Sequence, residues 1–422
     1  MPTGQNIDLA KVAAGERGGA CFAARLLTGR VRPDSMALTT DGEQIGGLNF
    51  ASWDHLSLAS HPAVHEAALA ALAKHGPHAG GPLGWQGGSL VSQRLEARLA
   101  ELLCCREVTV FPTGWAAAFG AIQTLAREGD HVLLDCLADS ALQHAARGAT
   151  RNMHQMPHGS TEVMVERLAR LRADAPSVGI LVLAETVLLP DASVQDLRPL
   201  HAACRCHGAT LLVRIGHDFG ATGDGGFGTL GRQGLLGEVD VLVGSFTSVL
   251  ATGGGFVAAR QAGLRAALLD HASTLSSCAL SPVQAAVALA ALNIVASAEG
   301  QQRRRRLAAN VARLRDGLGA RAFDVLGEPG GLVPVVLGAT ATAHRMTDTV
   351  LRAGALVNLQ EHPAVAHGAA RWPLLVMSDH TPDQIDRLIA VAVAAREAAS
   401  CRAVPRFATH TAMSPIPAKG ES

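Results

Sequence analysis

The amino-acid sequence predicts an α/β protein with a mostly parallel central sheet, helices on both faces of that sheet, and a smaller C-terminal α/β domain. Between residues 108 and 243, short apolar runs rich in β-branched residues alternate with helical patterns. Parallel strands need long crossover connections, usually helices, so this alternation indicates a parallel sheet. The 422 residues, of which 48% are apolar and 17% charged, suffice for one large domain and a smaller one.

Each expected strand of the large domain has four or five residues and is separated from the next element by a Gly, Asp or Pro turn. The expected strands are 108–111, 131–134, 179–183, 209–213 and 239–243. The expected helices are 115–127, 140–148 and 196–207. This order of short strands and longer helices is typical of crossover units.

A long apolar helix is expected over 282–298, followed by the run Gln-Gln-Arg-Arg-Arg-Arg at 301–306. Because this run begins a helix that continues to about residue 314, we interpret it as a solvated helix face and not as a nucleic-acid patch. The smaller domain then alternates strands with helices, at 332–337, 341–353, 374–377 and 382–399. The predicted division is an N-terminal arm (1–60), a large domain (61–290), a small C-terminal α/β domain (291–400) and a flexible tail (401–422).

Composition excludes several classes of partner. The formal net charge is zero and the pI is about 7.3, which gives no reason to expect nucleic acid or an anionic membrane. The first thirty residues do not show a secretion signal, and no apolar run of about twenty residues occurs, so we expect a cytoplasmic protein without a transmembrane segment. The eight cysteines include Cys104-Cys105 and Cys204-Arg205-Cys206, and they are expected to be buried reduced thiols; a metal or redox role is the alternative.

Short motifs occur in a fixed order over about residues 45–398. They are Asn49-Phe50, 56–62, the glycine-rich loop 80–84, 95–100, Thr113-Gly114-Trp115-Ala116-Ala117, 211–217, 244–255, 279–282 and His380-Thr381. Individually these motifs are weak, but in this order they resemble the α-oxoamine synthase family. The resemblance implies a pyridoxal-phosphate (PLP) dependent transferase of fold type I, usually a homodimer with shared sites, that condenses an amino acid with an acyl thioester.

The phosphate end of the implied cofactor site looks intact. Thr113, Gly114 and Trp115 lie between a strand and a helix, so backbone N–H groups and the positive end of the helix dipole would face an anion. Ser245 matches a family hydroxyl that helps to hold the phosphate. The alternative is that Thr113 is only a helix N-cap and Ser245 only a strand-end residue.

The ring end of the site differs from the family at the lysine position. Family members hold PLP as a Schiff base with a lysine amine, which also moves the substrate's α-proton. Here that position is Ser248, in the segment before Gly253-Gly254-Gly255. The chain has only three lysines, Lys11, Lys74 and Lys419. The resemblance therefore implies that PLP binding is vestigial or weak.

Two further ring positions differ, and one family residue is kept. The family places an aspartate against the pyridine nitrogen, and here Arg214 stands there; opposite charges about 4 Å apart attract by about 4 kcal/mol at an effective dielectric near 20, a term that the arginine would reverse. The stacking histidine of the family falls on Asp139. His217 matches a family histidine that bonds the cofactor's phenolic oxygen, with a purely structural histidine as the alternative.

The substrate side also departs from the family. Of an Arg-x-Arg pattern, only Arg371 remains, in Arg371-Trp372-Pro373; in the family one of these arginines binds the substrate carboxylate. The stretch 185–190 replaces a Ser- and Asp-rich family segment and predicts a more apolar pocket.

Three functional hypotheses remain open. The first is a degenerate, non-catalytic subunit that forms a homodimer or pairs with an intact family member. The second is a PLP-independent transferase that binds a CoA or phosphopantetheine thioester, or an acyl-carrier protein, in the phosphate cup and uses His217 as base. The third is an acyltransferase with residual PLP binding, which would require Ser248 not to be the lysine position. No metal is expected in any of them.

Overall fold

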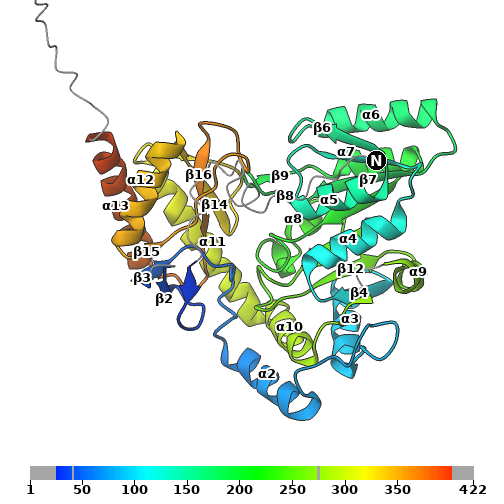
Figure 1. Ribbon diagram of the computed structural model, residues 1–422, viewed down its shortest axis with the longest axis horizontal. Helices are drawn as coiled ribbons and strands as arrows, with labels where there is room; N and C mark the ends of the chain where they lie inside the picture. The colour runs from blue at the N-terminus through cyan, green and yellow to red at the C-terminus, as the bar shows by residue number, and fades with distance from the viewer. Residues whose placement is uncertain (1–24, 40–41, 273–275, 402–422) are drawn as a thin grey trace, which may run out of the picture.

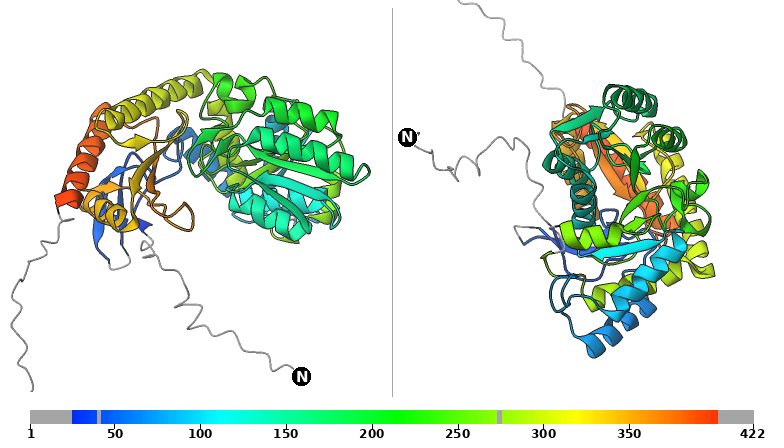
Figure 2. Two further views of the ribbon diagram at one scale, coloured as in Figure 1. Left: turned by 90° about the horizontal axis from the view of Figure 1, so that it is seen from above. Right: turned by 90° about the vertical axis from the view of Figure 1, so that its right-hand side faces the viewer.

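The computed structural model describes residues 25–39, 42–272 and 276–401, and these form two lobes (Figure 1). One lobe contains the large sheet and the other contains the C-terminal helices and strands. Helix α10 (Pro282–Val295) packs in the large lobe, and α11 (Ala298–Gly319) continues from it after a bend of 78°. The view from above in Figure 2 shows α11 passing from the large lobe to the smaller one. No single described helix is long and apolar enough to cross a membrane, although the bent pair α10 and α11 passes that test of length and composition together.

The large sheet has seven strands. In spatial order they are β4 (Glu107–Phe111), β12 (Gly255–Ala259), β11 (Val241–Ser245), β10 (Thr210–Arg214), β7 (Ile180–Glu185), β5 (His131–Asp135) and β6 (Asn152–Met156). Strand β12 runs antiparallel to both its neighbours, and the other pairs are parallel. The predicted α/β fold with a mostly parallel sheet is therefore confirmed.

Both faces of the large sheet are buried, as parallel strands require. Successive residues of a strand point to opposite faces. Leu211 and Val213 accordingly belong to one apolar core, and Leu212 belongs to the other. The first core is covered by α3 (Leu90–Leu102), α6 (Thr161–Asp174), α7 (Arg198–Cys206) and α10. The second is covered by α4 (Gly114–Leu125), α5 (Ser140–Ala149) and α9 (Leu264–His271).

The smaller lobe is built around an antiparallel sheet. Its strands are β13 (Asp324–Val325), β14 (Leu332–Gly338) and β16 (Ala370–Leu375), and it packs with α11, α12 (Thr340–Arg352) and α13 (Pro382–Cys401). Trp372 of β16 is almost fully buried and donates a hydrogen bond of 2.8 Å from Nε1 to Oγ1 of Thr347 on α12. This bond satisfies the one polar atom of a large core side chain.

The N-terminal strands pair with a strand of the C-terminal lobe. Strands β1 (Leu26–Leu27), β2 (Asp34–Leu38) and β3 (Gln44–Asn49) form an antiparallel set, and β3 pairs in parallel with β15 (Ala355–Leu356). Helix α2 (Pro62–His75) follows and packs against α10. Part of the expected arm thus pairs with the C-terminal lobe, while the four domain boundaries themselves stay predictions.

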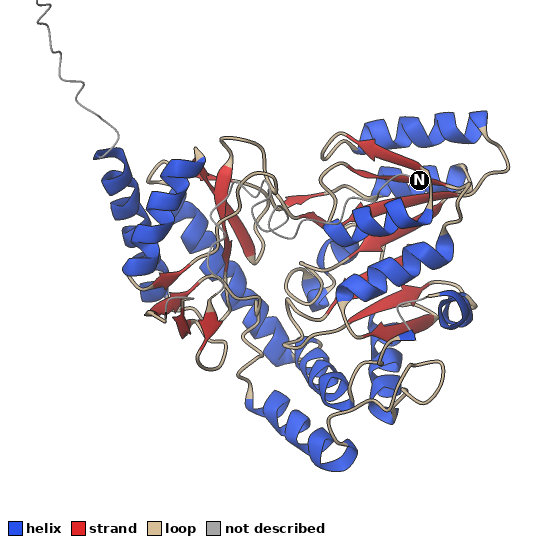
Figure 3. Cartoon of the chain, in the orientation of Figure 1, coloured by secondary structure: helices blue, strands red, loops and turns tan. Residues whose placement is uncertain are grey.

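Some elements differ from the expected ones (Figure 3). Strand β12 was not expected, because it directly follows a glycine run, yet all five of its residues are buried. Strand β16 begins four residues earlier than the expected strand 374–377. The short hairpin β8 (Val187–Leu188) and β9 (Ser193–Val194), the 3-10 turn η1 (Asp224–Gly226) and helix α8 (Gly228–Arg232) were also not expected. Most of the predicted tail, residues 402–422, lies outside the described residues.

The six cysteines whose side chains the structure describes are free thiols, but burial was predicted incorrectly for two of the four discussed above. Among the described residues none is in a disulfide; Cys204 is buried, Cys105 is partly buried, and Cys104 and Cys206 are exposed. Cys104 has a positive φ of 54° in the turn between α3 and β4, and such turns lie at the surface. No group of three or more metal-ligating side chains occurs in the described part of the chain.

Candidate functional site

The site residues gather where the parallel strands of the large sheet end. Thr113 follows β4, Asp139 follows β5, Glu185 and Arg214 end β7 and β10, and Ser245 ends β11. Because parallel strands end at the same edge of a sheet, these positions meet there, as ligand sites of open α/β sheets do. The structure thus brings together most of the residues that the sequence selected.

At the phosphate end, α4 begins close against β11. Oγ1 of Thr113 accepts a hydrogen bond of 2.9 Å from the Ala116 N–H, so Thr113 is the N-cap of α4. A Cβ added to Gly114 would lie 2.7 Å from Cβ of Ser245, which explains the glycine. Oγ of Ser245 lies 2.9 Å from Oγ1 of Thr247, and both threonines are exposed. Together Thr113, Gly114, Ser245 and Thr247 form a polar surface, which is called the phosphate cup after the role that the sequence predicts for it.

Two details of the phosphate cup were not anticipated. Thr247 was missed, although a second hydroxyl residue two positions after Ser245 was a usable signal. The ring of Trp115 stacks on Phe119 at 4.9 Å between centroids, one turn further along α4. The Trp115 side chain therefore packs along its own helix and is half exposed.

At the ring end, Arg214 is held by two carboxylates, and these three residues are called the Arg214 cluster. Nη2 of Arg214 lies 3.2 Å from Oδ2 of Asp139, and Nη1 lies 3.3 Å from Oε1 of Glu185. Oε2 of Glu185 also accepts a 2.9 Å hydrogen bond from the Asp139 backbone N–H. The side chains of Arg214 and Asp139 are each 15% exposed and that of Glu185 is 2% exposed.

Glu185 is the one charged exception to the more apolar pocket expected from 185–190, whose residues Val187, Leu188 and Leu189 are apolar. Strand β7 runs two residues beyond its predicted end, and in its register Glu185 lies directly beside Arg214 on β10. Burial raises the pKa of Glu185 to about 7, and the nearby Arg214 guanidinium opposes that rise. The site therefore contains a buried carboxyl group that titrates near neutral pH.

His217 accepts a hydrogen bond from the Arg214 cluster. Nη1 of Arg214 lies 3.3 Å from Nε2 of His217, and a guanidinium can only donate, so Nε2 is the acceptor. Burial, with the positive charge of Arg214 adding to it, holds the pKa of His217 well below its usual value. The neutral ring consequently carries its proton on Nδ1, which is buried and has no hydrogen-bond partner among the described residues. In this geometry His217 offers an N–H donor.

His55 lies near His217 and was not selected by sequence reasoning, which had no signal for it. Its Nδ1 donates a 3.0 Å hydrogen bond to the Val376 carbonyl, so its Nε2 is an acceptor. That Nε2 is also buried without a hydrogen-bond partner among the described residues. The Trp53 ring contacts both histidines, at 5.9 Å from His55 and 5.0 Å from His217. Both unpaired nitrogens therefore belong to buried rings that contact Trp53, one as a donor and one as an acceptor.

Ser248 is buried in the loop after β11. Only 2% of the surface of Ser248 is exposed. Its backbone carbonyl oxygen accepts a 3.0 Å hydrogen bond from the backbone N–H of His55. Lys74 is the one lysine in the described residues, and it is exposed on α2, which lies at the bottom of Figure 1, away from the site. Lys11 and Lys419 lie outside the described residues.

Arg371 joins the small lobe to the β8–β9 hairpin. Its residue is 8% exposed, its Nη1 donates to the Pro190 carbonyl, and its Nε donates to the Ala369 carbonyl. The expected role of Arg371 in binding a substrate carboxylate stays a prediction, and its observed contacts are with backbone oxygens.

His158 holds the same hairpin from the large lobe and was also missed. Its Nδ1 lies 3.0 Å from Oδ1 of Asp135 and its Nε2 lies 3.3 Å from Oδ2 of Asp191. These contacts, first with Asp135 and then with Asp191, raise the pKa of His158 to about 10. His158 is therefore protonated at neutral pH and links two carboxylates.

The chain that has this fold and this group of residues at the strand ends matches a known protein family. The family model for aminotransferase class I and II matches residues 46–391. The 8-amino-7-oxononanoate synthase of Thioalkalivibrio sulfidiphilus is 31% identical over 86% of this chain and 91% of its own. That of Citrobacter koseri is 32% identical over 82% of this chain and 88% of its own.

Solved structures give the same relationship. A structure described as SPT with PLP has a TM-score of 0.83 and 27% identity, covering 90% of this chain and 93% of that one. The serine palmitoyltransferase of Sphingomonas wittichii has a TM-score of 0.84 at 24% identity, covering 93% and 96% of the two chains, and shows the shared fold. The chain belongs to the α-oxoamine synthase family within aminotransferase class I and II, which confirms the resemblance in its motif order.

Proposed function

We propose that this chain is a degenerate α-oxoamine synthase homologue that cannot anchor PLP covalently and acts as a non-catalytic subunit, either in a homodimer or beside an intact relative. The observation that carries the proposal is the Arg214 cluster together with Ser248. Each stands where the resemblance places a group that the family chemistry needs, and Arg214 and Asp139 pair with each other.

The ring-end residues do not fit PLP. A Schiff base requires a primary amine, and the Ser248 hydroxyl cannot form one. The guanidinium of Arg214 stands where a carboxylate would have to face the pyridine nitrogen. Moving Arg214 aside would leave the carboxylates of Asp139 and Glu185 without their cation in a buried site, which costs several kcal/mol.

The phosphate cup, by contrast, remains suited to an anion. Thr113 and Thr247 are exposed, and the first N–H groups of α4 carry the positive end of the helix dipole. A protein that keeps its fold and one anion site but lacks the reacting amine is suited to support a neighbouring subunit. Because sites of this family are shared between subunits, such a chain can still contribute residues to an active partner.

Incubation with PLP tests the loss of covalent anchoring. We expect the purified protein to give no borohydride-reducible adduct within the sheet-end site, since Lys74 is the one described lysine. A Lys74→Arg variant controls for reaction at that exposed amine. A stoichiometric reducible adduct that persists in Lys74→Arg and is lost in Thr113→Val would overturn the proposal, because Lys11, Lys419 or the N-terminal amine would then anchor PLP at the phosphate cup.

Co-expression tests the subunit role. We expect this chain to form a mixed oligomer with an intact α-oxoamine synthase from the same cell, seen as co-elution on a sizing column and by mass of the intact complex. If this chain associates only with itself in the presence of that relative, the proposed pairing with the relative is wrong and only the proposed homodimer remains.

A PLP-independent transferase of acyl thioesters is the second candidate, and one observation favours it. The buried Nδ1–H of His217 is an unused donor, and a thioester carbonyl oxygen accepts such bonds. In this candidate mechanism His217 donates a hydrogen bond from Nδ1–H and does not act as the base that the sequence predicted. His217→Ala should then abolish turnover of an acyl-CoA or acyl-carrier protein thioester, and Thr113→Val should weaken its binding; unchanged turnover and binding in both variants would exclude this candidate.

A further inference from the structure

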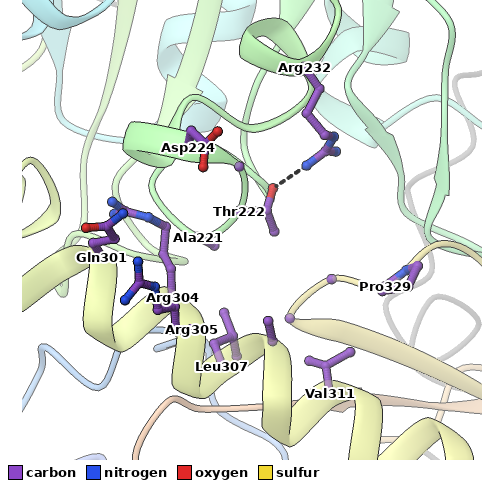
Figure 4. Close-up of a pocket in the computed structure, with 14 residues that line it drawn as sticks. Ala221, Thr222, Asp224, Arg232, Gln301, Arg304, Arg305, Leu307, Val311 and Pro329 are labelled. Carbon is purple, nitrogen blue, oxygen red and sulfur yellow. Dashed lines mark hydrogen bonds between the residues drawn. The ribbon is translucent and has the colours of Figure 1, made fainter.

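Two features lie outside the strand-end site, and the first is a cavity of about 380 Å³ beside α11 (Figure 4). Arg304 and Arg305 of α11 lie on its wall, and Arg232 of α8 lies across the cavity from them. Arg304 is 8% exposed and donates a 2.7 Å hydrogen bond to the Val295 carbonyl, so the prediction of a solvated helix face is wrong for this residue. Because the three arginines lie on separate walls, they do not converge on one anion.

The second feature is a contact between the side chains of Cys278 and His78, which are 200 positions apart in the chain. Sγ of Cys278 lies 3.2 Å from Nε2 of His78. Cys278 precedes α10, His78 follows α2, and both residues are exposed. Helices α2 and α10 pack against each other, so the contact joins the loops at the ends of two packed helices.

The direction of this hydrogen bond follows from a second bond to the His78 ring. The Gly80 backbone N–H donates a 3.0 Å hydrogen bond to Nδ1 of His78, so Nδ1 is an acceptor. The neutral ring therefore carries its proton on Nε2, and Nε2–H donates to the Cys278 sulfur. A negatively charged sulfur accepts such a bond more strongly than a thiol does, and the thiolate is the nucleophilic form of cysteine. His78 consequently favours the reactive form of Cys278.

Four other cysteines lack this arrangement. Burial raises the pKa of Cys105 to about 11 and that of Cys204 to about 12, so both remain thiols at neutral pH. Cys104 and Cys206 are exposed, but their sulfur atoms make no hydrogen bond within the described part of the chain. Of these five cysteines, Cys278 therefore combines access to solvent with an N–H donor at its sulfur.

We propose that Cys278 is the thiol at which small disulfides such as oxidised glutathione modify this chain, with His78 as the residue that positions and activates its sulfur. The Cys278 thiolate attacks one sulfur of the disulfide, so that a new S–S bond forms as the old one breaks. The leaving thiolate takes up the proton that Cys278 released to solvent. Cys278 is thereby oxidised to a mixed disulfide, and half of the reagent is reduced to a thiol. This site does not depend on the proposed subunit role.

Modification of Cys278 would also act on the glycine-rich loop. The Ala279 N–H, next to Cys278, donates a 3.0 Å hydrogen bond to the Gly81 carbonyl of that loop. The same loop carries Trp85, which is 86% exposed. A group attached to the Cys278 sulfur would take the place of the His78 ring, and one of these two hydrogen bonds would be lost. The modification is therefore expected to loosen the loop.

Peptide-resolved kinetics with oxidised glutathione test this site on the full-length protein. At pH 7 we expect the mixed disulfide to form about threefold faster on Cys278 than on Cys104 or Cys206, because a stabilised thiolate is more abundant but less nucleophilic. His78→Ala should lower the rate at Cys278 to that of the two other thiols and leave their rates unchanged. Equal rates at the three cysteines, or a rate at Cys278 that His78→Ala does not change, would overturn the proposal.

His75→Ala is the matched control, because His75 lies three positions earlier, at the end of α2, and its side chain makes no hydrogen bond among the described residues. We expect it to change the rate at Cys278 by less than about twofold, with melting temperatures showing that both variants fold. An effect as large as that of His78→Ala would count against a specific role for His78.

Hydrogen–deuterium exchange tests the effect on the loop. We expect exchange in residues 77–88 to increase at least severalfold once oxidised glutathione has modified the protein, since local opening follows the loss of local contacts. Cys278→Ser, treated in the same way, cannot form the mixed disulfide and should show no increase. Unchanged exchange in the modified protein would show that the loop does not respond to Cys278.

Discussion

The guanidinium of Arg214 contacts carboxylates that come from two other strand ends, those of β5 and β7. Its charge is therefore compensated, and the sequence comparison, which treated Arg214 and Asp139 as two separate losses, missed that they form one ion pair. Glu185 completes the arrangement. Arg214, which the resemblance would place against the cofactor ring, is thus paired with carboxylates inside this fold.

Removal of Arg214 should show this directly. We expect Arg214→Met to lower the free energy of unfolding by about 3 kcal/mol at pH 8, because it leaves two carboxylates unpaired in a buried site. Chemical denaturation measures the change, and an added Glu185→Gln should restore part of it. Arg352→Met, which breaks an exposed pair with Asp348, is the control and should cost no more than about 0.5 kcal/mol. Equal losses in the two single variants would contradict the buried ion pair.

His158 predicts a pH dependence of stability. Its folded pKa of about 10 lies above the ordinary value of 6.5, so the protonated ring stabilises the folded state fully below pH 6.5, and this contribution is lost as the pH rises toward 10. We expect His158→Gln to lower the melting temperature by several degrees at pH 6 and by much less at pH 10, each relative to the unmodified protein. Calorimetric melts at the two pH values measure it. A pH-independent difference would show that His158 contributes only packing.

Helix α4 is positioned by the close approach of its first residue, Gly114, to the end of strand β11. Gly114, its first residue, lies against Ser245 so closely that a Cβ would collide with it. The sequence indicated both the helix and its N-cap, because Thr113 precedes an apolar helical pattern. It could not show that the helix end touches β11, since that contact depends on sheet order.

A methyl group at this contact should separate helix and strand. We expect Gly114→Ala to lower the free energy of unfolding by about 2 kcal/mol through overpacking. Gly129→Ala is the control, because nothing lies within 4 Å of a Cβ added there. Urea unfolding compares the two variants. If Gly114→Ala behaves like Gly129→Ala, the close packing of α4 on β11 is not present in solution.

The ends of the strands were the part of the sheet that the sequence predicted least well. The site residues lie at these strand ends. The β-branched run 179–183 predicted β7 correctly, but the strand continues to Glu185. Hydrophobic periodicity marks the buried middle of a strand, and it fades where the strand reaches the polar sheet edge. Consequently Glu185 was assigned to an apolar pocket lining when it is the buried carboxylate beside Arg214.

The two lobes are joined through the β8–β9 hairpin. Arg371 on β16 donates to the Pro190 carbonyl, and the Glu328 N–H donates a 3.0 Å hydrogen bond to the Ala192 carbonyl. Ala192 also shares a small apolar core with Leu332 and Leu375. The hairpin thus docks the large lobe on the small sheet.

Loss of this docking should be visible in exchange of backbone amides. We expect Arg371→Met to increase hydrogen–deuterium exchange in 187–194 at least severalfold while leaving β10 and β11 unchanged, since local opening follows the loss of local contacts. Arg345→Met on α12 is the control, because the exposed Arg345 side chain hydrogen-bonds only Thr342 among the described residues. Unchanged exchange in the hairpin would mean that the apolar core alone holds the lobes together.

The sequence by itself determined the α/β fold, the family, and the absence of an amine at Ser248, because hydrophobic periodicity, motif order and residue identity are properties read along the chain. Only the tertiary structure decided that the charge of Arg214 is compensated, that His217 carries its proton on Nδ1, and that Arg304, predicted on a solvated helix face, is buried and donates to the Val295 carbonyl. Each of these depends on which side chains become neighbours once strand register and helix rotation are set. Charge and hydrogen-bond energies fall off within a few ångströms. They are therefore fixed by spatial neighbours that the linear order does not reveal.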